Sequence, residues 1–174
     1  MHMVIRNIVY AEDHDSALVK AKSNFEILCE DQRPFDYYGT YDMDGVRFGD
    51  QFTEPVYSIE SDIGRQLVRD GWRSTLRDMR FHLKRIKKEI NSCNINDLMK
   101  NKLRELQYDF YAVGQYRGES CWLYDDDSSG IKDRRHLDSV LSKWEELYTT
   151  GNCRHQTWDI EHHNVYVVPA DVHY

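Results

Sequence analysis

The order of hydrophobic patterns along the chain constrains its fold more than any other feature. Residues 4–10 and 164–168 are rich in β-branched side chains, which predicts a strand near each end. The second strand is expected to resume after Pro169 and to reach His173. Between these ends, apolar residues recur mainly at intervals of three and four, which is the spacing of one helix face. The chain is therefore predicted to combine a sheet with a helical middle.

The apolar spacing predicts five helices. The first covers about residues 17–29 and follows a polar cluster, residues 12–16, of the kind that begins helices. Ser61 is expected to cap the second helix, which Gly71 should break or bend. The remaining helices are expected over residues 73–90, 95–106 and 137–147, the last of them ending at Gly151.

Three further strands are predicted from aromatic and β-branched residues, over residues 35–45, 108–118 and 121–126. An acidic, serine-containing turn should cover residues 125–130. If the three middle helices are set aside, the elements follow the order β-α-β-β-α-β.

This order predicts one α+β domain over residues 1–174. The expected architecture is a ferredoxin-like antiparallel sheet with two helices packed on one face. The segment at about 61–106 would be a helical insertion or a subdomain. An open α/β sheet is the alternative.

Composition limits the setting in which the chain works. No apolar run reaches the ~18 residues needed to span a bilayer, and the N-terminus lacks the pattern of a signal peptide. The four cysteines are Cys29, Cys93, Cys121 and Cys153. They are far apart in the sequence and form no CxxC pair. Reduced thiols in the cytoplasm are the simplest expectation, which for a viral protein means the host cytoplasm. No membrane association is expected, and the oligomeric state is left open.

Positive charge is concentrated in one predicted helix. Residues 73–89 hold seven basic and two acidic residues, a charge of +5, whereas the whole chain carries −7 and the remainder therefore −12. The basic residues are Arg73, Arg77, Arg80, Lys84, Arg85, Lys87 and Lys88. Such a helix can steer an anionic partner, or it can be a solvated face that pairs with acids of the same chain. Nucleic acid could bind through residues 73–88, but the overall negative charge disfavours it.

Aromatic residues are concentrated in the predicted strands. They are Tyr37, Tyr38, Tyr41, Phe110, Tyr111, Tyr116, Trp122 and Tyr124. Stacking on bases requires exposed rings beside basic residues, and Arg117 is the only basic residue in these segments. Exposed tyrosines therefore favour a contact with a protein partner, through Tyr37, Tyr38, Tyr41 and Tyr116 together with Arg117.

No cofactor is predicted, although a divalent metal remains an alternative. Zinc could bind a C-terminal group formed by Cys153, His155, His162 and His163, whose spacing matches no compact zinc motif. Magnesium could bind the acids Asp36, Asp42, Asp44 and Asp50 or residues 125–127, which also fit ordinary turns. No P-loop, GxGxxG, HExxH or GxSxG motif is present, and no residue is predicted to be catalytic.

The segment Asp109-Phe-Tyr-Ala-Val-Gly-Gln-Tyr-Arg-Gly118 resembles a motif of small uncharacterised phage and mobile-element proteins. The closing residues 167–174 are similar to a strand of those proteins that ends in an acid near a histidine. Gln115, Tyr116 and Arg117 replace the Gly and the Arg-Trp pair of that motif. The resemblance implies a viral or mobile-element setting, and it brings no known activity and no catalytic residues.

Together these features favour a non-enzymatic protein-interaction module, plausibly encoded by a phage, that binds a host or viral protein. One alternative is a metal-dependent phosphodiesterase or nucleotide-processing enzyme that uses the acids and the C-terminal histidines. Another is a module that binds a small molecule such as a nucleotide.

Overall fold

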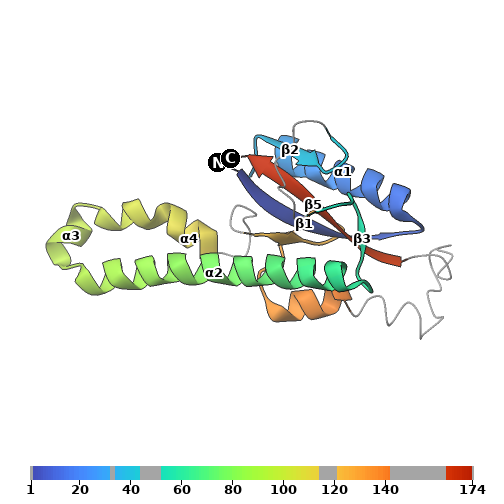
Figure 1. Ribbon diagram of the computed structural model, residues 1–174. Helices are drawn as coiled ribbons and strands as arrows, with labels where there is room; N and C mark the ends of the chain where they lie inside the picture. The colour runs from blue at the N-terminus through green and yellow to red at the C-terminus, as the bar shows by residue number, and fades with distance from the viewer. Residues whose placement is uncertain (1, 32–33, 44–51, 114–120, 142–163, 174) are drawn as a thin grey trace, which may run out of the picture.

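The structure is a computed structural model that describes residues 2–31, 34–43, 52–113, 121–141 and 164–173. It shows a mixed α+β fold with a five-stranded sheet and a long pair of antiparallel helical segments (Figure 1). Among the described residues, no helix combines the length and the apolar character needed to cross a bilayer.

The two longest strands form the centre of the sheet. Strand β1 (His2–Ala11) pairs antiparallel with β5 (Asn164–His173) along ten residues, from His2 opposite His173 to Ala11 opposite Asn164. Both predicted strands are thus confirmed, and β5 continues through Pro169 without interruption. Their near-continuous apolar sequences fit strands that are buried on both faces.

The shorter strands complete the sheet in the order β2-β5-β1-β4, with β3 also pairing with β5. They are β2 (Tyr37–Thr40), β3 (Tyr57–Ser58) and β4 (Leu123–Tyr124). Strand β4 runs parallel to β1, so the sheet is mixed and the prediction of an antiparallel sheet is wrong. The ferredoxin-like arrangement is not confirmed, because β2 pairs with β5.

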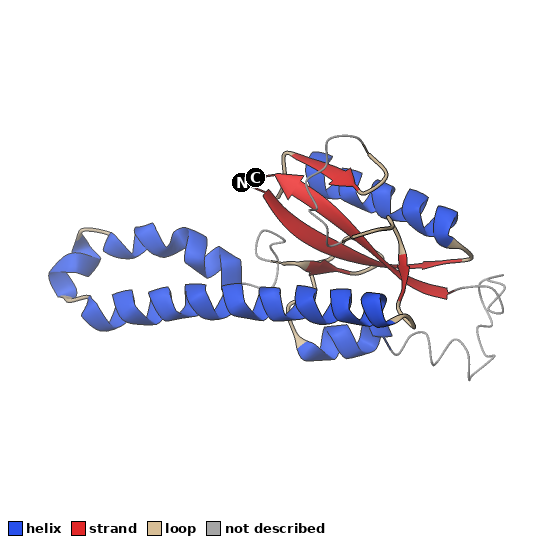
Figure 2. Cartoon of the chain, in the orientation of Figure 1, coloured by secondary structure: helices blue, strands red, loops and turns tan. Residues whose placement is uncertain are grey.

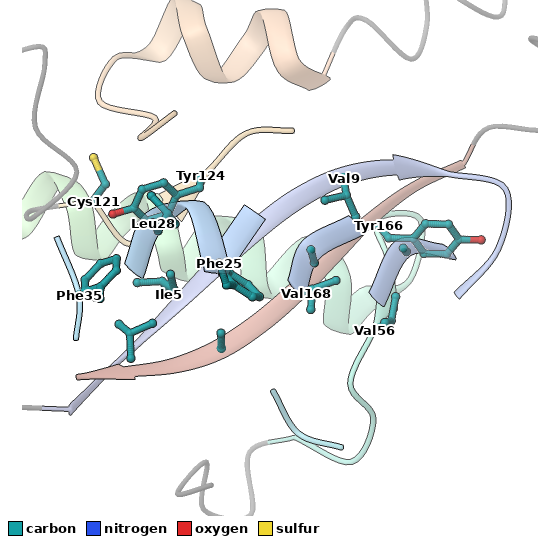
Figure 3. Close-up of a cluster of buried hydrophobic side chains, with 14 of the residues drawn as sticks. Ile5, Val9, Phe25, Leu28, Phe35, Val56, Cys121, Tyr124, Tyr166 and Val168 are labelled. Atoms are coloured by element: carbon teal, nitrogen blue, oxygen red, sulfur yellow. The ribbon is translucent and has the colours of Figure 1, made fainter. Parts of the chain in front are cut away.

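Helices cover both faces of the sheet (Figure 2). Helix α1 (His14–Glu30) buries Phe25 and Leu28 against Ile5 and Val9 of β1, in the core shown in Figure 3. Ile8 points the other way, towards helix α2 (Asp62–Ser92), because side chains alternate along a strand. The second core also receives Leu137 and Val140 from a helix over residues 134–141. The two helices predicted to pack on one face are α1 and the helix over residues 134–141. They lie on opposite faces, with α2 on the same face as the second, so this prediction is wrong.

Helix α2 is continuous for 31 residues, about 46 Å, so the predicted break at Gly71 is wrong. Ser61 caps it as predicted, with its side chain accepting a hydrogen bond from the Gly64 amide at 2.9 Å. Gly71 has a different purpose, since a Cβ there would lie 3.1 Å from Cδ of Arg6 and 3.1 Å from the Trp122 carbonyl oxygen. Glycine at this position allows the helix to cross closely over β1 and β4.

The predicted helix over residues 95–106 is divided into two short pieces. These are α3 (Ile95–Met99) and the 3-10 helix η2 (Lys102–Leu106), separated at Asn101, whose φ of 58° lies in the left-handed region. Asparagine is one of the few residues that adopt this conformation readily. The chain therefore turns back at this point and runs antiparallel to α2.

The predicted strand over residues 108–118 is wrong where the structure describes it. Gln107–Val113 forms helix α4, which packs on α2. The buried residues Leu106, Asp109 and Ala112 recur every three positions, as they do on a helix face. Residues 114–118 lie outside the described residues.

The acidic turn at residues 125–130 is confirmed. Oδ1 of Asp125 accepts hydrogen bonds from the amides of Asp127 and Ser129, at 3.0 and 2.8 Å. Oδ2 of Asp125 lies 2.8 Å from Nε2 of His136. The predicted strand over residues 121–126 is shortened to β4, and the predicted helix over residues 137–147 is described only as far as residue 141.

Candidate interaction surface

The long antiparallel pair of helical segments extends beyond the sheet as an arm (Figures 1 and 2). We call residues 79–113 the helical arm; it consists of the second half of α2 followed by α3, η2 and α4. Its first half continues the same helix that packs on the sheet, so the arm needs no hinge or linker at its base.

The base of the arm is fixed to the sheet through Trp122, which lies next to β4. The Trp122 amide donates to Oγ1 of Thr75 at 2.9 Å, and its indole Nε1 donates to Asp78 at 2.6 Å. The Arg77 guanidinium lies 5.7 Å from the centroid of the Trp122 ring, within cation–π range. These contacts hold the middle of α2, where the helix leaves the sheet.

Inside the arm, a buried carboxylate connects α4 to α2. Oδ1 of Asp109 lies 2.7 Å from Nδ1 of His82 and 3.3 Å from Nη1 of Arg85. Asp109 is 1% exposed, and its Oδ2 has no hydrogen-bond partner within the described structure. The rings of Phe81 and Tyr108 pack edge-on against His82.

The outer surface of the arm is unusually apolar. Of the fourteen large hydrophobic side chains that are exposed in the described residues, eight belong to the arm. They are Phe81, Leu83, Ile90, Ile95, Leu98, Met99, Tyr108 and Phe110. The two most exposed are Met99 at 81% and Ile95 at 71%, near the turn at the far end. A shallow hollow of about 450 Å³, lined in part by Leu103 and Phe110, continues this surface towards α4.

Four of the predicted basic contact residues are exposed on α2, and three of them, Arg80, Lys84 and Lys87, belong to the arm, whereas Arg73 precedes it. None of these four has a carboxylate oxygen within 4.0 Å among the described residues. Nε of Arg77 lies 3.7 Å from Oδ1 of Asp78, and its guanidinium also contacts the Trp122 ring. The sequence left open that these four cations pair with acids of the same chain. No such pair is found among the described residues.

The tyrosines that were predicted to share this contact lie elsewhere. Tyr37 and Tyr38 lie on β2 and Tyr41 follows it, at an edge of the sheet away from the arm (Figure 1). Tyr37 stacks on His173 at 5.1 Å, and burial beside Glu26 raises the pKa of Tyr38 to about 12. Tyr116 and Arg117, which were predicted to take part in the same contact, lie outside the described residues.

The acids proposed for a metal are used in local contacts where they are described. Asp36 lies 3.0 Å from Nδ1 of His173, and Asp42 accepts from Lys22 and Thr40, both at 2.6 Å. No group of three or more His, Cys, Asp or Glu suitable for a metal occurs among the residues with described placement. Asp44, Asp50, Cys153, His155, His162 and His163 lie outside them.

Two of the three described thiols, Cys29 and Cys121, have little nucleophilic character. Burial raises the pKa of the Cys121 thiol to about 12 and that of Cys29 to about 11. Since the thiolate is the reactive form, both remain protonated at neutral pH. Neither thiol therefore matches the low-pKa environment of a catalytic cysteine.

Two features of the arm escape sequence reasoning. Ile95 and Met99 share one apolar face with Leu106 in the helix predicted over residues 95–106, and such a face is normally buried. Both are exposed, because the chain turns back between them and Leu106. The contact between His82 and Asp109 joins residues 27 positions apart. The only signal for it was the spacing of Leu106, Asp109 and Ala112, which fits a helix better than a strand.

Comparison with known proteins gives a family and no relative of known activity. Neither the curated proteins nor the solved structures include a match to this chain. The model of the family described as "Domain of unknown function (DUF7995)" matches residues 1–174. The chain is therefore a member of the DUF7995 family.

Proposed function

We propose that this chain is a non-enzymatic protein-interaction module and that its helical arm is the contact surface. The observation that carries the proposal is the concentration of exposed apolar side chains on the arm, with Ile95 and Met99 at its far end. Exposed apolar patches of this kind mark protein contacts, because burying them removes apolar surface from water.

Charge indicates the chemistry of the partner. The arm holds eight Lys or Arg against four Asp or Glu, a net charge of +4, so the rest of the chain carries −11. An acidic partner surface would be attracted to the arm and repelled by the rest of the molecule, which orients the encounter. The partner is thus a protein with an apolar centre surrounded by acidic residues.

A protein fits the arm better than a nucleic acid does. Ile90, Ile95, Leu98 and Met99 are aliphatic, and such side chains gain nothing from a phosphate backbone. The strong negative charge on the remainder of the chain also opposes binding to a polyanion. The resemblance of residues 109–118 extends the proposal to a host or viral protein in the host cytoplasm.

Reversing the charge of Arg80 and Lys84 together is expected to weaken partner binding at least about tenfold, because both cations are exposed on the arm. The partner is first captured from host cells by chemical crosslinking to the wild-type chain, and its affinity is then measured by biolayer interferometry. Arg77 is left unchanged, because its replacement would remove the contact with Trp122, and a change in stability could then be mistaken for a change in binding.

Arg135→Glu is the matched control, because Arg135 is an exposed arginine on the helix over residues 134–141, outside the arm. It should bind the partner as the wild type does. Equal affinity of the Arg80→Glu/Lys84→Glu variant and the wild type would overturn the assignment of the basic face. Capture of nucleic acid in place of a protein would overturn the class of partner.

A further inference from the structure

A separate cavity of about 720 Å³ lies beside the first half of α2, near the start of that helix. Its lining combines charged residues with apolar ones, and they are Arg6, Phe52, Asp62, Ile63, Gln66, Leu67, Arg69 and Asp70. All belong to β1, to residue 52 or to the first nine positions of α2, so the cavity shares no residue with the helical arm.

Arg6 is the unusual member of this lining. It comes from the central strand β1 and is only 8% exposed, in a position where a cation is rarely found without a partner. Its Nη1 donates to the Val4 carbonyl oxygen, but its Nε is buried and has no hydrogen-bond partner within the described structure. No carboxylate oxygen of the described residues lies within 4.0 Å of the guanidinium.

The surroundings of Arg6 keep its guanidinium in place. The arginine stem passes beneath α2 at Gly71, where an added Cβ would lie 3.1 Å from Cδ of Arg6. Burial lowers the pKa of Arg6, and the charge of Asp70 offsets this only in part. The side chain is therefore held at the cavity with donors to spare and a charge that is incompletely balanced.

We infer that this cavity binds a small organic anion, whose carboxylate or phosphate group pairs with Arg6 and whose apolar body contacts Phe52, Ile63 and Leu67. A guanidinium presents planar, paired donors that match both kinds of oxyanion. A volume of several hundred Å³ is typical of small-molecule sites, and this lining offers three apolar side chains beside five polar or charged ones. Arg69 adds a second positive charge to the lining from α2, and Asp62 and Asp70 add two negative charges. Asp62 already pairs with Arg65 at 2.8 Å, outside the lining.

A purely structural role for Arg6 makes the opposite prediction about stability. If Arg6 served mainly to pair with Asp70 across the cavity, removing either charge would destabilise the protein. If Arg6 awaits an anion, replacing it with an apolar side chain of similar length should stabilise the protein without ligand, because a buried, poorly paired charge is removed. The sign of the change in stability caused by Arg6→Met therefore distinguishes the two roles of Arg6.

The test compares the full wild-type chain with Arg6→Met by thermal unfolding, at constant ionic strength, with sodium phosphate and sodium benzoate as probes and sodium chloride as reference. We expect at least one probe to raise the wild-type Tm by several degrees more than that of Arg6→Met. Without a probe, Arg6→Met should melt at or above the wild-type Tm. A stronger effect of benzoate indicates a carboxylate ligand, and a stronger effect of phosphate indicates a phosphorylated one.

Arg73→Met is the matched control, since Arg73 is an exposed arginine of α2 that does not line the cavity and has no carboxylate oxygen within 4.0 Å among the described residues. It should respond to both probes as the wild type does. The inference is overturned if neither probe raises the wild-type Tm above that in chloride, if Arg6→Met responds equally, or if Arg6→Met and Asp70→Asn both melt well below the wild type. Should Arg6→Met fail to fold, NMR of the wild-type arginine Nε–H groups decides, because the Arg6 signal must move when a probe is added.

Discussion

Gly64→Ala is expected to destabilise the fold by about 3 kcal/mol or more. A Cβ at this position would lie 2.0 Å from the carbonyl oxygen of Ser58 and 2.8 Å from its carbonyl carbon. Both are backbone atoms of β3, so neither can move aside as a flexible side chain could. The first turn of α2 would have to lift away from the strand that precedes it. Urea unfolding followed by circular dichroism measures the loss.

The sign of this effect is what makes it informative. Alanine normally stabilises a helix relative to glycine by about 0.5–1 kcal/mol, so helix propensity alone predicts a more stable protein. Gly71→Ala is the comparison, because its nearest contacts are at 3.1 Å and one of them is the flexible Arg6 side chain. It should cost about 1 kcal/mol. A Gly64→Ala protein as stable as the wild type would contradict the close contact between α2 and residues 58–59.

Asp109→Ala is expected to loosen the helical arm without unfolding the sheet. It removes the carboxylate that His82 and Arg85 share, and it leaves the buried His82 ring without that partner. Losing such a buried contact costs about 2 kcal/mol, which corresponds to roughly 30-fold faster opening. Few other buried side chains hold the arm together, chiefly Ile86, Leu106 and Ala112.

Hydrogen exchange measured by mass spectrometry locates this effect. Amides of η2 and α4 should exchange roughly 30-fold faster in Asp109→Ala, whereas amides of β1 and β5 should keep their wild-type rates. Glu105→Ala is the control, since Glu105 is an exposed acid on the same arm. Unchanged exchange in α4, or equal acceleration by Glu105→Ala, would show that the Asp109 contact does not secure the arm.

Several elements could be predicted from sequence because their local patterns agree with their surroundings. Strands β1 and β5 are apolar along their length because both faces are buried. Asp13 caps helix α1, with its side chain accepting a hydrogen bond from the Ser16 amide at 2.8 Å, and the apolar residues of α1 face one core. In these elements, propensity, capping and burial all favour the same structure.

Other elements could not be predicted because tertiary contacts override local preference. Residues 108–113 are rich in aromatic residues, which favour strands, yet packing of Asp109 and Ala112 on α2 makes them helical. Gly71 was expected to break or bend the helix, whereas its role in the structure depends on Arg6 and Trp122, which are distant in sequence.

Some residues of the candidate surfaces could likewise be predicted from sequence, and others could not. The cations of the arm could be located from sequence, since charge is carried by residue type alone. The exposure of Ile95 and Met99 could not, because a helical apolar stripe normally predicts burial and only the path of α3 and η2 leaves it uncovered. The sequence did not indicate that Arg6 is buried, because its burial depends on α2 passing over β1.

The most direct test of the arm as a protein-binding surface replaces its two most exposed apolar side chains, in the variant Ile95→Ser/Met99→Ser. Both side chains are largely in solvent, so the Tm should stay within a few degrees of the wild-type value. Val19→Ser is the matched control, since Val19 is 70% exposed on α1, away from the arm. In biolayer interferometry with the captured partner, the arm variant should bind at least about tenfold more weakly than the wild type, and Val19→Ser should bind equally well. Wild-type affinity in the arm variant, or a loss confined to Val19→Ser, would contradict the account.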